Sequence, residues 1–228
     1  ESVNIKLHKD GIFIQCVETI KQRKKRLLNK YPIIISHLIY SFDFVIHRIL
    51  PRLPYIKNSY FMIFKGKSQR LSYAETLGRL YSCGFEHIAD IEIDKITWFA
   101  VKKVSKPALS YKVTYGPIIK LKRLGKNGKI IWVYKFRTMH PYSEYLQEYI
   151  YKLNSLESGG KFKNDFRVST IGRIFRKYWL DELPMLINFL KGELKFFGVR
   201  PLSEQYFNLY PEDYKQRRMT YKPGLIPP

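Results

Sequence analysis

The sequence predicts a mixed α/β protein in two parts, a small α/β piece over residues 1–105 and a larger α/β unit over residues 106–228. Three observations favour this fold class. Short strand-like segments alternate with periodic or capped helical segments along the chain. Hydrophobic residues make up 45% of the 228 residues, which is enough to build a core. No internal repeat or low-complexity tract is present, which argues against a repeat architecture.

In the first part, residues 11–16 are typical of a short buried strand, and a basic helix should follow it. Ser72 and Glu75 have the spacing of a capping box, in which the serine bonds forward and the glutamate reaches back. Residues 85–93 and 96–102 predict two strands that turn around Asp94–Lys95. We expect core and helix-end positions at Leu77, Leu80 and Gly84.

The longest apolar run, residues 33–50, contains six polar residues, so we expect no membrane-spanning segment, which would need ~20 mostly apolar residues. At about 100° per residue the run predicts an amphipathic helix. We expect this helix to pack on a core. An interfacial helix lying on lipid is the alternative, because a basic run precedes it. The polar residues are Ser36, His37, Ser41, Asp43, His47 and Arg48, and the apolar side carries Ile35, Leu38, Phe42, Ile46, Ile49 and Leu50.

The second part should begin with a β-hairpin over residues 117–123 and 130–136. Asn127–Gly128 between the two runs is a strong short hairpin signal. A polar helix over residues 143–156 and a loop at 158–160 should follow. A basic helix and an apolar helix ending near residues 191–192 complete the expected order.

Charge limits the kind of partner. Forty-one Lys and Arg face 19 Asp and Glu, a formal net charge of +22. This imbalance indicates a polyanionic partner, namely nucleic acid, an anionic membrane surface or phosphorylated substrates. Cys16 and Cys83 are too few for a disulfide framework and indicate a reducing compartment. No secretory signal is visible, and a chain that begins at Glu1 without Met suggests a fragment of a longer protein.

Asp181 and Glu182 stand side by side at a predicted helix start, with Pro184 in the expected first turn. A helix N-terminus favours negative charge, and basic residues surround this pair in the sequence. Two adjacent carboxylates in such a place suit a nucleophile and a metal ligand acting on an anionic substrate. The alternative is a structural one, with Asp181 as an N-cap and Glu182 as a solvated first-turn acid.

Three blocks of sequence carry a family resemblance: "GPIIKLKRLGKNGKIIWVYKFRTM", "NDFRVSTIGRIFRKYWLDELPMLINFLKGELKFFGVRPL" and "YKPG". In order and spacing they resemble the bacterial sugar transferases, polyprenyl-phosphate hexose-1-phosphate transferases of the monotopic phosphoglycosyl transferase type, over about residues 115–225. The resemblance implies transfer of a sugar-1-phosphate from a nucleotide-diphosphate sugar to a polyprenyl phosphate, with Mg²⁺. The reaction would start exopolysaccharide, capsule or glycan synthesis at the cytoplasmic face of the bacterial inner membrane.

The resemblance also implies residue roles. Asp181 would attack the sugar-bearing phosphorus and form an aspartyl-phosphosugar intermediate, and Glu182 would hold Mg²⁺. Arg173 and Arg176 share a predicted helix face, and one of them could instead brace Asp165 or Asp181. Val199 replaces the first proline of the family's Pro-Arg-Pro, which puts the rigidity of that turn in question. The implied substrate contacts are Lys135, Arg137, Asn164, Asp165, Arg167, Arg173, Arg176, Arg200 and Arg218.

One departure from the family concerns the membrane. Family members usually have an apolar run that enters the membrane shortly before the block that begins here at Gly116, and residues 98–114 contain no apolar run long enough. We therefore expect peripheral or monotopic association with an anionic membrane surface. Apolar residues near the acidic pair should pack in a core, with a place at an interface as the alternative. They are Trp179, Leu180, Leu186, Phe189, Leu190, Phe196 and Phe197.

The first part weakly resembles the C-terminal part of a class I methyltransferase over about residues 8–104, and would otherwise be an accessory domain used for docking. The Gly-rich turn that holds S-adenosylmethionine is absent, so we expect no binding of that cofactor. A basic nucleic-acid-binding or docking module without catalysis is the alternative function, supported by the charge and 18 Tyr. Because no known nucleic-acid motif is present, nucleic acid is not an expected partner.

Overall fold

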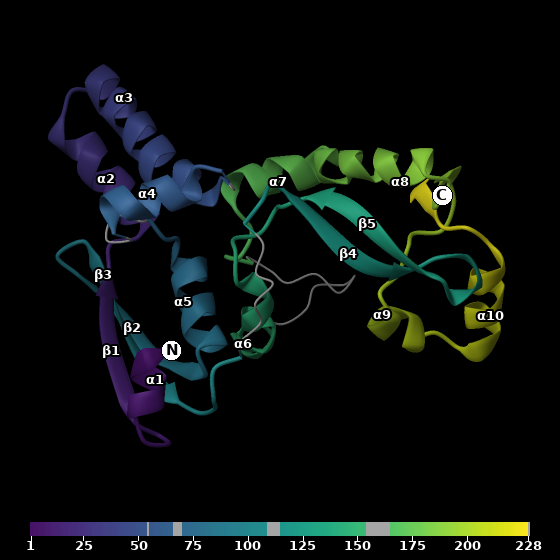
Figure 1. Cartoon of the computed structure of the whole chain (residues 1–228), viewed down its shortest axis with the longest axis horizontal. Coiled ribbons are helices and arrows are strands. Elements are labelled where there is room, and N and C mark those ends of the chain that lie inside the picture. The colour runs from purple at the N-terminus through teal and green to yellow at the C-terminus, as the bar shows by residue number, and fades with distance from the viewer. Residues whose placement is uncertain (54, 66–69, 109–114, 154–164, 228) are drawn as a thin grey trace. The chain divides into compact units, whose positions relative to one another are not determined.

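The computed structural model describes residues 1–53, 55–65, 70–108, 115–153 and 165–227. Helices and strands are mixed along the chain, which confirms the α/β class (Figure 1). The chain forms two compact units that interleave in sequence. Unit 1 contains Glu1–Tyr115 and Met139–Arg167, and unit 2 contains Gly116–Thr138 and Val168–Pro228.

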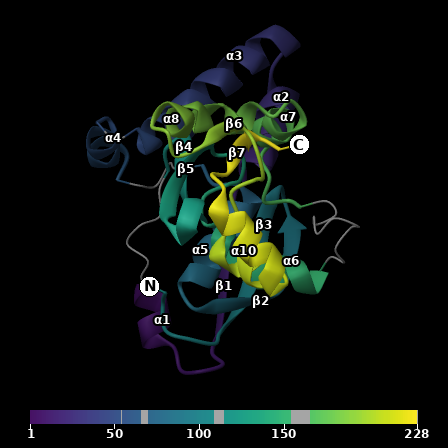
Figure 2. The same cartoon turned by 90° about the vertical axis from the view of Figure 1, so that its right-hand side faces the viewer.

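Unit 1 is built on a three-stranded antiparallel sheet in the order β1-β3-β2 (Figures 1 and 2). The strands are β1 (Ile12–Val17), β2 (Phe85–Ile93) and β3 (Ile96–Lys103). Asp94 and Lys95 have φ angles of 50° and 64°, as a tight two-residue hairpin turn requires. All three strands were predicted from the sequence, each to within about one residue. The predicted burial of β1 is wrong, because Ile12 and Ile14 are 61% and 60% exposed on one face of the sheet.

The core of unit 1 lies between this sheet and α5 (Tyr73–Ser82). Leu77 of α5 and Phe99 of β3 are both fully buried there. A second layer comes from the short helix η4 (Ser143–Leu146) and from α6 (Gln147–Leu153), which add Leu146 and Ile150 to the core. The predicted polar helix over residues 143–156 is therefore present as far as Leu153, and the loop at 158–160 lies outside the described residues.

The capping box predicted at the start of α5 is only half correct. The Ser72 Oγ accepts a hydrogen bond from the Glu75 N–H at 3.1 Å, as expected. The Glu75 side chain does not reach back to Ser72. Its carboxylate is instead paired with three arginines, because it points into the interior of unit 1. Gly84 follows α5 with a φ angle of +81°, as predicted.

The remaining helices of unit 1 are α1 (Ser2–Lys6), α2 (Ile20–Lys30), α3 (Ile33–Phe44), its continuation through η1 (Val45–Ile49) and η2 (Leu50–Arg52), and α4 (Lys57–Phe64). The helix that begins at Ile33 buries polar side chains and exposes most of its apolar side, the opposite of a helix that packs on a core. Its polar residues Ser36 and Arg48 are 1% and 5% exposed, whereas Ile34 and Phe42 are 78% and 68% exposed. The predicted core packing of its apolar side is wrong.

The expectation that no segment could span a membrane also needs correction. Within the described ranges, one helical run, Ile33–Arg52, is long and apolar enough to cross a membrane by length and composition. The polar residues in the run did not prevent this, because 20 residues with few charges retain a strongly apolar average. Only 11% of its apolar window is buried, so it is not the core helix of a globular unit.

Unit 2 begins with the predicted hairpin, formed by β4 (Ile118–Leu124) and β5 (Ile130–Phe136). Asn127 and Gly128 in the connecting η3 (Lys126–Gly128) have φ angles of 55° and 71°. The other elements are α7 (Thr170–Lys177), η5 (Leu180–Met185), α8 (Leu186–Leu190), β6 (Lys195–Phe197), α9 (Glu204–Asn208), α10 (Glu212–Thr220) and β7 (Gly224–Ile226). Ile131 and Val133 of β5 pack with Met185 and Leu194 in a small core.

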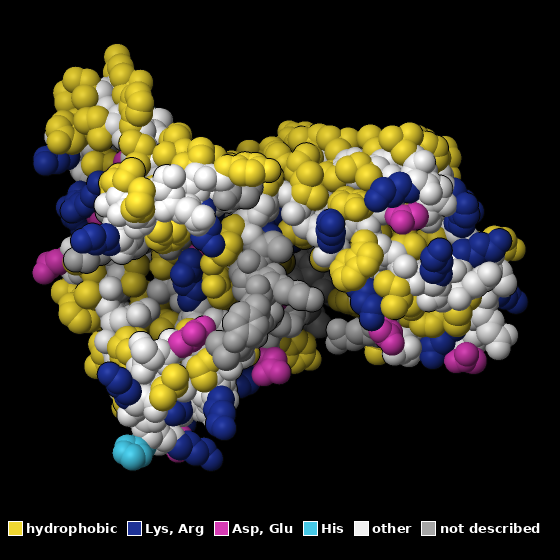
Figure 3. All heavy atoms as spheres, viewed as in Figure 1, with side chains coloured by type: hydrophobic (Ala, Val, Ile, Leu, Met, Phe, Trp, Pro, Cys, Tyr) yellow, Lys and Arg dark blue, Asp and Glu magenta, His cyan; other side chains and the backbone are white. Residues whose placement is uncertain are grey.

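The predicted core packing of the apolar residues near the acidic pair is wrong as well. Hydrophobic side chains gather on the outer surface along α7 and α8 (Figure 3). The core of unit 2 is small and is already filled by residues of β5, η5 and the segment after α8. The exposed residues are Trp179, Leu180, Leu186, Phe189, Leu190, Phe196 and Phe197, with exposed fractions of 36–83%.

Candidate active site

Asp181 and Glu182 lie in the first turn of η5, which confirms the predicted helix start. The N-cap position belongs to Trp179 and has no side-chain cap hydrogen bond, so the alternative in which Asp181 is an N-cap is wrong. Trp179 directly before η5 has a φ of 56°, a left-handed conformation that a bulky residue rarely adopts. This kink ends α7 and starts a new helical segment. Pro184 lies inside the same segment. The side chains of Asp181 and Glu182 thus project from a short helical segment between α7 and α8.

Two basic residues from different elements bind the Glu182 carboxylate. Its Oε1 accepts a hydrogen bond from Lys135 Nζ at 2.8 Å and from a terminal nitrogen of Arg200 at 2.6 Å. Lys135 belongs to β5, and Arg200 follows β6. The side chains of Glu182, Lys135 and Arg200 are 12%, 22% and 49% exposed, so the cluster is open to solvent on the Arg200 side. The structure therefore brings together three of the predicted site residues.

Asp181 differs from its neighbour. Within the described part of the chain, its carboxylate makes no hydrogen bond and no ion pair. The residue is partly exposed. A carboxylate with unused lone pairs beside a cluster of cations can attack an electrophile, because no competing partner must first be displaced.

A buried asparagine that sequence reasoning missed fixes this arrangement. Asn188 of α8 is 0% exposed. Its Oδ1 accepts from the Tyr134 N–H at 3.0 Å, and its Nδ2 donates to the Trp132 carbonyl at 2.8 Å and to the Glu193 carboxylate at 2.6 Å. Asn188 thereby ties α8, which follows the acidic pair, to β5, which carries Lys135. The available signal was one polar residue inside the apolar run of residues 186–190.

The far wall of the site is a parallel pairing of two short strands, β6 and β7, that bring "GVRP" and "KPG" side by side. Lys195 pairs with Gly224 and Phe197 with Ile226. A Cβ on Gly224 would collide with the backbone of Gly198, so only glycine permits this approach. The Gly224 N–H donates to the Val199 carbonyl at 2.9 Å. The turn that lacks the family's first proline is thus held by a hydrogen bond to the tail.

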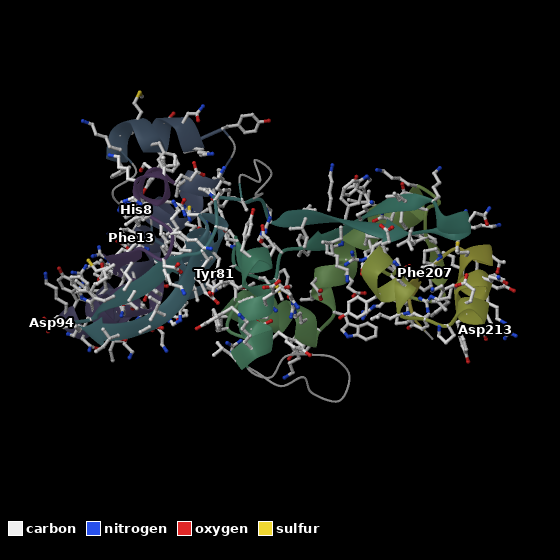
Figure 4. All side chains as sticks on the ribbon, turned by 90° about the horizontal axis from the view of Figure 1, so that it is seen from below. His8, Phe13, Tyr81, Asp94, Phe207 and Asp213 are labelled. Carbon is white, nitrogen blue, oxygen red and sulfur yellow. The ribbon has the colours of Figure 1, made fainter. Side chains whose placement is uncertain are left out.

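Arg218 supports the same wall. Its guanidinium donates to the Arg200 carbonyl at 2.7 Å and lies over the Tyr210 ring at 5.2 Å from the centroid. A pocket opens beside Arg200 and Arg218 in unit 2. Phe207, which projects from α9 (Figure 4), is 8% exposed at its edge. The pocket is lined by Leu124, Gly125, Val199, Arg200, Leu202, Phe207, Arg218, Met219 and Pro223.

Three other predicted residues of unit 2 have less direct links to the pair. Arg176 Nε donates to Thr138 Oγ1 at 3.0 Å, and Arg137 Nε donates to the Gly116 carbonyl at 3.0 Å. Arg173 is exposed on α7. Among the residues described in unit 2, neither Arg173 nor Arg176 pairs with Asp181.

Asp165 and Arg167 belong to unit 1. The Arg167 guanidinium donates to both Asp165 carboxylate oxygens and to Gln147 Oε1 at 2.8 Å, and Arg167 is 3% exposed. Such burial indicates a residue that braces unit 1 and leaves almost no surface for direct substrate contact. Asn164, which was predicted to contact substrate, lies outside the described residues.

The acidic pair suits a hard divalent cation that is shared with substrate. Glu182 Oε2 accepts no hydrogen bond from the described residues, and the Asp181 carboxylate is adjacent in sequence. No group of three or more His, Cys, Asp or Glu residues that could hold a metal occurs in the described ranges. Magnesium is typically bound by one or two carboxylates together with substrate phosphates and water, so the residues present fit Mg²⁺.

The chain is similar in sequence to a known family and to several known proteins. Residues 96–227 match the family described as bacterial sugar transferase. The chain is 34% identical over 133 residues to the undecaprenyl-phosphate galactose phosphotransferase of Salmonella typhimurium, covering 56% of this chain and 26% of that protein. It is 37% identical over 113 residues to the galactosyl transferase CpsE of Streptococcus agalactiae, covering 48% and 25%.

A third relative is the exopolysaccharide production protein ExoY of Rhizobium meliloti, 36% identical over 94 residues, which cover 39% of this chain and 42% of that protein. The chain therefore aligns with about a quarter of the first two relatives and less than half of the third.

Proposed function

Because the chain belongs to the bacterial sugar transferase family, we propose that it transfers a sugar-1-phosphate from a nucleotide-diphosphate sugar to a polyprenyl phosphate. One observation carries this proposal: two carboxylates lie in the same helical turn but differ in their partners. Glu182 is bound by Lys135 and Arg200, and Asp181 makes no hydrogen bond or ion pair with the described residues. The names of the relatives support it, since one of them is an undecaprenyl-phosphate galactose phosphotransferase.

In the proposed mechanism, an Asp181 carboxylate oxygen attacks the phosphorus that bears the sugar. The bond from this phosphorus to the bridging oxygen breaks, and the nucleoside monophosphate leaves with the electron pair. An oxygen of the polyprenyl phosphate then attacks the same phosphorus and releases Asp181. Two displacements replace one difficult reaction between two anions, which is the advantage of a carboxylate nucleophile.

The basic residues around the pair neutralise charge during both displacements. Lys135 and Arg200 hold Glu182 in place, and their remaining N–H groups can reach phosphate oxygens on the open side. Mg²⁺, when bound at Glu182, would neutralise the diphosphate oxygens. The pocket beside Arg218 supplies apolar walls on the same side as Arg200, which suits the nucleotide part of the donor.

We further propose that the protein works at an anionic membrane surface on the cytoplasmic face, where a polyprenyl phosphate would be presented. Three observations support this: the formal charge of +22, the outward-facing apolar side of the helix that begins at Ile33, and the exposed apolar surface along α7 and α8. Flotation with vesicles of phosphatidylcholine and phosphatidylglycerol tests it. Failure to float at any salt concentration would contradict the proposal. Release by salt would indicate electrostatic attachment, and retention would indicate apolar insertion.

A transfer assay tests the function. Radiolabelled sugar phosphate from a UDP-sugar should move into the lipid fraction of an extract containing polyprenyl phosphate. A brief incubation without the acceptor should leave label on the protein at Asp181, detectable by mass spectrometry. Binding to RNA in a gel shift with no transfer would instead favour the nucleic-acid alternative.

For the first part of the chain, we keep the resemblance to the C-terminal part of a class I methyltransferase as a hypothesis about origin. It implies no retained methyl transfer, since the Gly-rich turn is absent from the sequence. Calorimetry with S-adenosylmethionine should show no binding. Micromolar binding would contradict the hypothesis that this part has only a docking role.

A further inference from the structure

Unit 1 contains a buried carboxylate with more positive charge around it than it can balance. Glu75 is 0% exposed, and its Oε2 accepts from Arg48 and from Arg52, each at 2.5 Å, while its Oε1 accepts from Arg79 at 3.1 Å. Within the described ranges, Glu75 is the only carboxylate paired with any of these three arginines. Three guanidinium charges therefore face one negative charge.

The other polar neighbours do not reduce this excess. His140 Nδ1 lies 3.4 Å from an Arg48 nitrogen. Burial, followed by the charge of Arg48, lowers the pKa of His140 to about 4, so the ring is neutral at pH 7. Tyr115 is also neutral, because burial raises its pKa. The cluster carries a formal excess of two positive charges, and buried charge without a counterion is unfavourable.

Two donors in this cluster are unused. The Nε atoms of Arg52 and Arg79 are buried and have no hydrogen-bond partner among the described residues. The exposed fraction of the side chain rises from 6% for Arg48 to 18% for Arg52 and 31% for Arg79. The cluster is therefore closed at Arg48 and open toward Arg52 and Arg79, where the unused donors lie.

Two tyrosines border the open side. The Arg79 guanidinium lies 5.0 Å from the centroid of the Tyr142 ring, and the Arg52 guanidinium lies 6.0 Å from that of Tyr115. Arg79 also donates to the Tyr115 hydroxyl at 3.3 Å, and this hydroxyl donates to the Tyr142 hydroxyl at 3.0 Å. Both rings therefore lie against the arginines that carry the unused donors.

The backbone is adapted to hold this arrangement. Tyr142 has a φ of 64°, an unfavourable conformation for an aromatic residue. A Cβ at position 78 would collide with the Tyr142 carbonyl oxygen, so Gly78 allows the Tyr142 loop to lie directly on α5. Strained backbone and a helical glycine are both unfavourable on their own. Their joint effect is to place the Tyr142 ring over Arg79.

We propose that Arg52 and Arg79, bordered by Tyr115 and Tyr142, form a binding site for a phosphate-type oxyanion. A phosphate monoester dianion matches the excess of two positive charges and offers acceptors to the partly exposed guanidinium groups of both arginines. Arg48 and Arg52 also end the apolar helical run Ile33–Arg52. The phosphate could thus belong to a soluble ligand or to a lipid headgroup. This site lies in unit 1 and is independent of the proposed transferase chemistry.

The test measures binding to the full chain without any activity assay. Inorganic phosphate is titrated while melting temperature and the ³¹P linewidth are followed, with chloride at equal ionic strength as reference. Vesicles of phosphatidylcholine containing phosphatidic acid provide the lipid arm, and phosphatidylglycerol replaces phosphatidic acid as the control. The variants are Arg52→Gln and Arg79→Gln. The matched control is Arg26→Gln, which removes an arginine of unit 1 that pairs with Glu18 at 2.9 Å in a more exposed place.

We expect saturable binding of one probe by the native chain and by Arg26→Gln, weakened about tenfold or more in Arg52→Gln and Arg79→Gln, as expected for a lost charge-assisted hydrogen bond. A response to inorganic phosphate identifies a soluble ligand, and a response to phosphatidic acid alone identifies a lipid. If an arginine variant does not fold, Tyr115→Phe, which removes a hydroxyl from the site, takes its place. No saturable binding by the native chain, or equal binding by every variant, would overturn the proposal.

Discussion

Two glutamates in this protein, Glu75 in unit 1 and Glu182 in unit 2, are each bound by more than one cation, yet they differ in what surrounds them. The Glu75 side chain is 0% exposed and both of its oxygens are used by arginines. The Glu182 side chain is 12% exposed, and one oxygen accepts from Lys135 and from Arg200, whose side chain is 49% exposed. Both carboxylate oxygens of Glu75 accept hydrogen bonds, whereas Oε2 of Glu182 accepts none from the described residues.

The difference indicates which features separate a structural ion pair from the proposed catalytic one. A high number of cations around a carboxylate is not sufficient, since Glu75 has three. The Glu182 site differs in having carboxylate oxygens that accept no hydrogen bond from the described residues. These are Oε2 of Glu182 and both carboxylate oxygens of Asp181. In unit 1 the excess is of positive charge, because three arginines surround one carboxylate, and this excess favours binding of an anion.

The largest expected effect comes from removing the proposed nucleophile. Asp181→Asn keeps the size of the side chain but removes the attacking charge. Transfer of sugar phosphate should fall by at least about 10³-fold, as for other enzymes that lose a nucleophile. The melting temperature should change little. Both quantities are measured on the same samples, by radiolabel transfer and by thermal unfolding.

The matched control is Asp213→Asn, which alters another first-turn aspartate of unit 2 on α10 (Figure 4). It should leave transfer unchanged. If Asp181 is only a first-turn acid that favours the helix start, the opposite pattern is expected: Asp181→Asn would cost about 0.3–1 kcal/mol of unfolding free energy and leave activity intact. Normal turnover by Asp181→Asn would rule out the mechanism.

The second effect concerns stability and tests Glu75, whose two carboxylate oxygens are both bound by arginines. Glu75→Gln leaves the buried Arg48 and the partly exposed Arg52 and Arg79 without a counter-charge. The unfolding free energy should therefore fall by about 3–5 kcal/mol in denaturant titrations. The control is Glu86→Gln, whose pairing with Lys152 at 3.4 Å is largely exposed and should be worth less than about 1 kcal/mol. Equal effects of the two changes would mean that burial does not distinguish these ion pairs.

Much of the fold could be predicted from local sequence patterns. The five longer strands and the hairpin at Asn127–Gly128 were found because alternation and turn chemistry act within a few residues. The β6–β7 pair was missed. It consists of three residues in each strand, far apart in sequence, and it depends on the close approach of Gly198 and Gly224, which no local pattern reveals.

Periodicity correctly gave the two sides of the helix that begins at Ile33 but not which side is covered. The usual inference assumes water outside, so that the apolar side turns inward. Here Arg48 is drawn inward by Glu75 and Asp43 by Arg23 at 2.7 Å, and the apolar side is left outside. The same ion pairs explain why Glu75 did not complete the capping box, since tertiary contacts prevailed over a local hydrogen bond.

In the candidate site, the positions of Asp181, Glu182, Lys135 and Arg200 could be anticipated, because motif blocks fix residue types at fixed spacing. Asn188 could not, because its role depends on the unpaired backbone groups of β5, which become visible only when α8 is docked. The substrate contact of Arg167 stays a prediction. Its burial and its ion pair with Asp165 depend on the folded unit 1 and could not be inferred from the motif block.

A third, smaller effect follows from His140. Its folded-state pKa is about 4, below the ordinary value of 6.5, so the folded protein resists protonation that the unfolded chain accepts. Stability should therefore be full above pH 6.5 and decline as the pH falls toward 4, by on the order of 2 kcal/mol. Glu75, whose lowered pKa reflects three arginines outweighing burial, adds a loss only below its ordinary value of 4.5.

Unfolding free energies at several pH values test this dependence. His140→Gln should flatten the decline between pH 6.5 and 4.5, and His8→Gln, at an exposed residue (Figure 4), should leave it unchanged. A decline that persists in His140→Gln would assign it to other groups.

The smallest expected effect is on the stability of the open site. Glu182→Gln removes one charge from a cluster whose partners can turn toward solvent, so the unfolding free energy should change by only about 1 kcal/mol or less. Activity should fall much more, and part of it should return at high Mg²⁺ if the lost oxygen weakens metal binding rather than positioning. A stability loss as large as that of Glu75→Gln would mean that Glu182 is a structural ion-pair centre as well. In that case the available oxygen of Glu182 would no longer distinguish the reactive glutamate from the structural one, and Asp181 alone would carry the assignment of the site.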